Sequence, residues 1–224
     1  MLFNTPIGAT MRSLLIAAVA LLSTAIMSAG TAIPGVTPGV RKFKLNNGVG
    51  KNALTFVSKA PAEDINGTAD GLTGAFDFDP SNIENAKGTI EVSVRSMKTA
   101  MTKRDDHMYS PVWLDADKYP NITFQLTNIQ DVTVSTNGQQ PTVIARATGK
   151  FTLHGVTKSF QAPIVLTYVK ESADTKKRSS GDLIALKVSF EIYLKDFDIK
   201  GKEGVVGKSV GEKISIEANL FANS

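Results

Sequence analysis

The sequence predicts an all-β protein that folds as a closed antiparallel barrel of eight strands. Two observations carry this prediction. Apolar and polar residues alternate along many segments, and short polar stretches join these segments. A period of two is typical of a strand with one dry face and one wet face. Short connections favour antiparallel pairing, because parallel neighbours need crossovers of a dozen or more residues.

The clearest strand runs from Ile184 to Leu194, where apolar residues occupy every second position. The other predicted strands show the same alternation over shorter or less regular segments. They lie at residues 54–59, 72–79, 90–94, 122–126, 142–153, 160–166 and 214–220. The segment 142–153 carries small inward residues at Ala145, Ala147 and Gly149. Eight strands are therefore expected.

Turn signals separate several of these strands. Asn66-Gly67, Asn137-Gly138 and the polar stretch 171–182 are predicted turns. Eight long strands in a flat sheet would leave long exposed edges, and closure into a barrel removes them. A sandwich of two sheets is the competing architecture.

One helical region is expected, from Lys103 to Tyr119. It mixes apolar and charged residues and is interrupted by Pro111, so it predicts one or two short helices near one mouth of the barrel.

The first 32 residues predict a cleaved signal peptide. Arg12 precedes an apolar run at 14–27, and small residues follow at 28–32. The run is shorter than the ~20 residues that span a bilayer as a helix. Cleavage after Ala29, Gly30 or Ala32 stays open. Residues 33–50 are then an N-terminal lead-in, and 51–224 form the barrel domain. We expect a periplasmic or secreted protein that does not span a membrane after cleavage.

Composition narrows the possible chemistry. The 224 residues carry a net charge of +4 without a basic stripe, which argues against nucleic acid as a partner. The absence of cysteine excludes disulfides, thiolate metal sites and cysteine nucleophiles. The two histidines, His107 and His154, have no further metal ligands at suitable spacing. No nucleophile pattern or cofactor motif accompanies His107, so no catalytic residue, metal or cofactor is predicted.

Several segments resemble the YceI-like family. Residues 104–108 (RDDHM) and 113–124 (WLDADKYPNITF) are similar to one family motif, 151–158 (FTLHGVTK) to a second and 195–199 (KDFDI) to a third. The resemblance runs from Leu54 to Phe221. It implies a lipocalin-like antiparallel barrel, exported in bacteria, with an apolar cavity that holds a polyisoprenoid or related amphiphilic lipid.

The chain departs from the family near its front. Many members open with a strand of the type HSxIxFxxxH, whereas residues 52–61 read NALTFVSKAP and contain no histidine. We therefore identify a divergent branch, in which the ligand is the least transferable property.

The expected lipid-binding residues share an inward apolar position on the predicted strands. They are Phe56, Phe76, Phe78, Val92, Phe124, Val188, Phe190 and Ile192. Plain core packing is the competing interpretation for each of them, because an eight-stranded barrel either fills with side chains or holds one ligand.

Four further residues are expected to act structurally at a lid. Asp105 caps or braces the short helix, His107 and Trp113 belong to the covering segment, and His154 makes a structural hydrogen bond in the hairpin before Gly155.

Together these features predict a periplasmic lipid-binding protein, not an enzyme, that encloses a polyisoprenoid, quinone-like or similar lipid for carriage or sequestration. An outer-membrane barrel is the first alternative, although aromatic residues make up only 7% of the chain, few for two aromatic girdles. A lipid-modifying enzyme that uses His107 as a base is a weaker alternative. A homodimer is left open.

Overall fold

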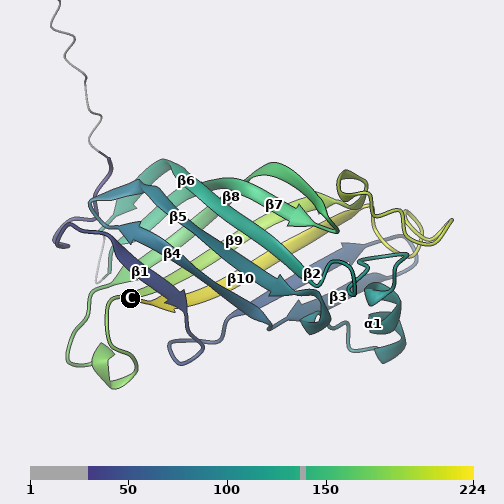
Figure 1. Ribbon diagram of the computed structural model, residues 1–224, viewed down its shortest axis with the longest axis horizontal. Coiled ribbons are helices and arrows are strands. Elements are labelled where there is room, and N and C mark those ends of the chain that lie inside the picture. Colours follow the sequence, from purple (N-terminus) through teal and green to yellow (C-terminus); the bar gives the residue numbers. More distant parts are fainter. Residues whose placement is uncertain (1–29, 137–139) are drawn as a thin grey trace, which may run out of the picture.

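The protein is a single closed barrel of antiparallel strands (Figure 1). The computed structural model describes residues 30–136 and 140–224. Most of the predicted signal peptide and the Asn137-Gly138 pair lie outside the described residues. Strand pairing runs through the whole sheet and returns to its start, because β1 pairs with β10 as well as with β4. The predicted closed antiparallel barrel is therefore confirmed.

The described residues contain ten strands, one α-helix and three short 3₁₀ turns. The strands are β1 (Arg41–Leu45), β2 (Ala53–Lys59), β3 (Asp64–Ala69), β4 (Leu72–Asp79), β5 (Asn82–Ser93), β6 (Asn121–Ser135), β7 (Thr142–Leu153), β8 (Val156–Val169), β9 (Leu183–Tyr193) and β10 (Lys213–Asn223). The helix α1 spans Thr102–Tyr109, and the turns are η1 (Val94–Ser96), η2 (Thr175–Lys177) and η3 (Leu194–Phe197).

Ten strands make eight positions around the wall. β1 and β2 both lie along one edge of β10, where β1 pairs with its last residues and β2 with residues 214–219. β3 and β4 form the next position in the same way, since β3 pairs with β2 and β4 with β1. The other six strands are continuous, so the barrel is the predicted eight-stranded one with two interrupted strands.

One side chain and one backbone amide bridge the interruption between β1 and β2. The Phe221 amide of β10 donates to the side-chain oxygen of Asn52 at 2.7 Å, and the Phe221 carbonyl accepts from the Asn46 amide at 2.9 Å. Asn52 is buried and its side-chain nitrogen donates to Asn47. The hydrogen bonding of the wall therefore continues past the break.

One end of the barrel is filled by aromatic side chains. Phe43 packs face to face on Phe76, with ring centroids 5.5 Å apart, and edge to face on Phe78 and Tyr168. Ile33 and Ile83 are fully buried beside them. We call this region the closed end. It lies opposite α1 in Figure 1.

A buried carboxylate ties the closed end together. The Tyr168 hydroxyl donates to Asp182, whose Oδ2 also lies 2.9 Å from Nε of Arg41. The other oxygen of Asp182 accepts from the Glu171 amide at 2.8 Å. Burial and the adjacent Asp182 carboxylate raise the pKa of Tyr168, so the phenol keeps its proton and donates it.

The strand predictions are confirmed in position, and β4 and β7 also match in their bounds. Two strands were missed. β1 falls within the predicted lead-in 33–50, so the boundary at residue 51 is wrong for the barrel, which already includes Phe43. β3 contains Asn66-Gly67, the predicted turn. Gly67 is in a strand because the Phe56 ring lies over it, where an added Cβ would be 2.0 Å from the ring.

The helical region forms one helix rather than two. α1 ends at Tyr109, and residues 110–119 continue as turns after Pro111. Within the two described ranges, none of the helices combines the length and apolar character that a membrane crossing would require.

We predict that Tyr168→Phe lowers the free energy of unfolding by about 1–3 kcal/mol, because it removes a buried hydrogen bond to a charged group. The midpoint of urea unfolding, at an unchanged slope, would measure this loss. Tyr193→Phe is the matched control, since Tyr193 is 45% exposed, and it should change the midpoint little. Equal effects of the two substitutions would contradict the role of the Asp182 contact.

Candidate ligand cavity

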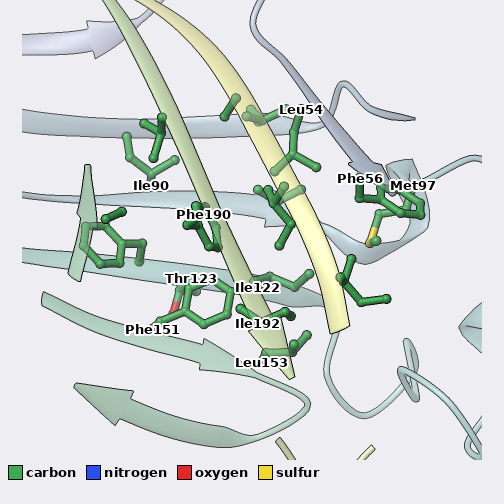
Figure 2. Close-up of a pocket in the computed structure, with 18 of the residues that line it drawn as sticks. Leu54, Phe56, Ile90, Met97, Ile122, Thr123, Phe151, Leu153, Phe190 and Ile192 are labelled. Carbon is green, nitrogen blue, oxygen red and sulfur yellow. The ribbon is translucent and has the colours of Figure 1, made fainter. Parts of the chain in front are cut away.

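A cavity of about 530 Å³ lies inside the barrel. Its wall runs from Phe78, Ala86 and Ile164 near the closed end to Met101 and Trp113 beside α1. Side chains from several strands, among them Phe56, Ile90 and Ile192, surround it in Figure 2. The volume falls in the range of about 300–1,000 Å³ that small-molecule sites occupy.

Small residues keep the middle of the barrel open. Ala147 and Ala162 face each other across β7 and β8, and both line the cavity. Ala218 of β10 and Gly88 of β5 also contribute little volume to the lining. An eight-stranded barrel is just wide enough for its side chains to fill it, so small inward residues leave room for one ligand.

All eight residues that the sequence predicts to bind lipid line this cavity. They are Phe56 of β2, Phe76 and Phe78 of β4, Val92 of β5, Phe124 of β6, and Val188, Phe190 and Ile192 of β9. Phe78 also packs against the side chains of the closed end, so it contributes both to the core and to the cavity wall. Their contact with lipid stays a prediction.

Several lining residues were missed by the sequence analysis. Phe151 and Phe160 form an aromatic group with Phe190, with ring centroids 5.1–5.9 Å apart. Both residues lie at alternating apolar positions of the predicted strands 142–153 and 160–166, so this pattern could have identified them. Met97 and Met108 also line the cavity but lie outside the strands, where the period of two gives no indication.

The helix α1 covers the mouth opposite the closed end. Asp105 is buried beside the cavity without lining it, and its Oδ1 accepts from both the amide and the hydroxyl of Thr99 at 2.7 Å. The Tyr109 hydroxyl donates to the Met97 carbonyl. These contacts hold the middle and the C-terminal end of the helix to the segment that precedes it, and the bracing role of Asp105 stays a prediction.

Trp113 connects the covering segment to the loop between β9 and β10. Its ring lies against Gly201, where an added Cβ would be 2.5 Å from the indole, and Gly201 has a φ of +64°. Trp113 also lines the cavity. The single tryptophan of the chain is therefore placed to report on the cavity contents.

His154 does not line the cavity. It forms a two-residue hairpin with Gly155, and both have positive φ, as a type I′ turn requires. Its Nδ1 lies 3.1 Å from the Phe197 carbonyl oxygen, so Nδ1 carries the proton and donates. The Tyr119 ring packs on its edge. His154 thus joins the β7–β8 hairpin to η3.

In the part of the chain that the structure describes, charged side chains line the cavity only beside α1. They are Glu63, Lys103 and Arg104, and the imidazole of His107 lines the same end. Arg104 Nη2 lies 2.9 Å from Glu63 Oε2, which links α1 to the turn between β2 and β3. Along the strands, the lining is apolar apart from a few neutral residues such as Thr89 and Thr123. The site therefore has a long apolar part and a short polar one.

A barrel with this cavity and these motifs matches a known family. The model of the YceI-like domain matches residues 49–222. The chain belongs to the YceI-like family. The family match begins at residue 49 and thus leaves β1 outside, although β1 completes the wall.

Relatives of this YceI-like protein occur in several bacteria. A UPF0312 protein of Pseudomonas putida is 28% identical over 200 residues, which cover 88% of this chain and 92% of the relative. A UPF0312 protein of Pseudomonas savastanoi is 32% identical over 153 residues, 68% of this chain and 72% of the relative.

Solved structures share the fold of this YceI-like protein. BcnA of Burkholderia cenocepacia has a TM-score of 0.61 at 20% identity and covers 80% of this chain and 99% of its own. A polyisoprenoid-binding domain of Saccharophagus degradans has a TM-score of 0.60 at 14% identity, covering 81% and 98%. Identities this low establish the architecture alone.

We predict that substitution by leucine lowers the free energy of unfolding by different amounts at two alanines on one face of β7. Both alanines are less than 10% exposed and belong to the same buried cluster, but only Ala147 also lines the cavity. Ala145→Leu should cost about 1–3 kcal/mol of unfolding free energy through overpacking. Ala147→Leu should cost clearly less, because its side chain enters empty space.

Urea unfolding of both variants would measure the difference. An equal loss of stability at the two positions would contradict the presence of a cavity at Ala147.

Proposed function

We propose that this protein encloses a polyisoprenoid, quinone-like or similar amphiphilic lipid and serves for its carriage or sequestration. The observation that carries this proposal is a barrel cavity with an apolar wall and charged side chains at one end only. Its similarity in fold to the polyisoprenoid-binding domain of Saccharophagus degradans gives further support.

The energetics favour an apolar chain as the occupant. Burial of each methylene group contributes about 0.8 kcal/mol, so a few isoprene units contribute several kcal/mol before the costs of association. Phe56, Phe124 and Phe190 provide aromatic surface for such a chain. The polar head of the lipid would lie beside α1, since burial of an unpaired polar group near the closed end is costly.

The geometry at His107 supports a protein that binds lipid without catalysing a reaction on it. An enzymatic mechanism would need a carboxylate to orient this histidine as a base. Of the two carboxylates that precede it, Asp105 is engaged by Thr99 through two hydrogen bonds of 2.7 Å, and Asp106 is exposed. We therefore propose a binding protein rather than a lipid-modifying enzyme.

The outer surface favours a barrel in water over one in a membrane. An outer-membrane barrel presents an apolar band to lipid. Here the outward residues of β9 and β10 include the exposed Lys187, Glu191, Lys213 and Glu217. Together with the predicted signal peptide, this supports the periplasm, or the exterior of the cell, as the location. The homodimer stays a prediction.

We predict that processing of the exported protein retains Thr31. The Thr31 amide lies 3.0 and 2.8 Å from the two carboxylate oxygens of Glu84, and Ile33 is buried in the closed end. Cleavage after Ala29 or Gly30 preserves these contacts, whereas cleavage after Ala32 removes the Thr31 contact. Intact mass measurement of periplasmic protein would locate the first residue, and a start at Ile33 or an unprocessed chain would contradict the prediction.

We predict that isoprenoid alcohols bind one per chain and change the fluorescence of Trp113. Titration of delipidated protein with farnesol and geranylgeraniol would give the dissociation constants. Ala147→Leu should weaken binding, because the added side chain occupies cavity volume, whereas Ser189→Leu on the outer face of β9 serves as the control. No saturable change with isoprenoids of these chain lengths, whether their head is an alcohol or an anion, would contradict the proposed function.

A further inference from the structure

At the polar end of the cavity, the basic side chains outnumber the carboxylates. Lys103, Arg104 and His107 supply hydrogen-bond donors to the lining, while Glu63 is the one carboxylate in that lining among residues 30–136 and 140–224. Lys103 and His107 are four residues apart and so lie on one face of α1. The same helix carries two aspartates that do not line the cavity: Asp105 is bound to Thr99, and Asp106 is exposed.

The single carboxylate is already paired. Glu63 Oε2 lies 2.9 Å from Arg104 Nη2, and the Arg104 side chain is only 25% exposed. Lys103 is exposed at the mouth and adds a second full positive charge. A ligand head in this place therefore meets an excess of cationic donors and no free carboxylate of the lining.

We infer that the ligand carries an anionic oxygen head, a phosphate ester or a carboxylate, which Lys103 and Arg104 hold beside α1. This inference rests on the proposed function and names the ligand class. Glu63 competes with the head for Arg104, so it limits affinity for anions. A neutral head, such as an alcohol, gains no comparable ionic contact.

Three ligands with one tail test this inference: farnesol, farnesoic acid and farnesyl phosphate, each titrated against Trp113 fluorescence. Both anions should bind more tightly than the alcohol, and the difference should shrink as salt screens the exposed charges. A preference for farnesyl phosphate over farnesoic acid would assign a phosphate head, and the reverse would assign a carboxylate.

Charge-neutralising variants locate the effect. Lys103→Gln should weaken anion binding about two- to fivefold, the size of an exposed ionic contact, and leave farnesol binding unchanged. Glu63→Gln should strengthen anion binding by a similar factor, because Arg104 becomes free. Lys187→Gln removes the same charge from the outer face of β9, outside the cavity lining, and should alter neither.

Equal affinity for farnesol and the two anions would overturn the inference while leaving the proposed function intact. Lys103→Gln or Glu63→Gln effects that are the same for alcohol and anions would also overturn it, since they would indicate a structural role at the mouth. Failure of all three ligands to bind would instead count against the proposed function itself.

Discussion

Closure of the wall along β10 is the constraint on which the rest of the structure depends. One edge of β10 pairs with β9 over its full length, and the other edge is shared by β1 and β2. The side chain of Asn52 and the amide of Asn46 maintain the hydrogen bonding where these two strands separate. Because the wall has no free edge there, all inward side chains face a common interior. The volume of that interior is then determined by which residues point inward.

The two ends of this interior are lined by different kinds of side chain, aromatic at one end and polar at the other, so the cavity has an apolar end and a polar end. Phe43, Phe78 and Tyr168 fill one end, with the Tyr168 hydroxyl satisfied by Asp182. At the other end a short polar helix covers the mouth and is held by hydrogen bonds and the Arg104–Glu63 ion pair. An amphiphile can satisfy both ends at once, with its tail toward the aromatic end and its head beside α1.

The period of two predicted most of the wall, because alternation reflects which face of a strand is dry. It failed at β1 and β3 for separate reasons. β1 is short and sits in a stretch rich in Gly, Pro and Asn, although Phe43 and Leu45 alternate there with lysines. Asn66-Gly67 is a strong turn signal, overridden by the Phe56 ring above Gly67. Alternation predicted the inward residues of the site, whereas the cavity was expected only from the family resemblance, since its volume depends on the summed volumes of side chains from several strands. The Arg104–Glu63 ion pair could not be predicted from alternation either, because its residues are 41 positions apart in the sequence.

Native mass spectrometry of the protein, purified from its own host without detergent, tests the central claim of an enclosed lipid most directly. The account predicts a species heavier than the processed chain by the mass of one lipid, which organic extraction converts to the lipid-free species while the barrel stays folded. A folded protein that carries only the mass of its chain, before and after incubation with isoprenoid lipids, would contradict it.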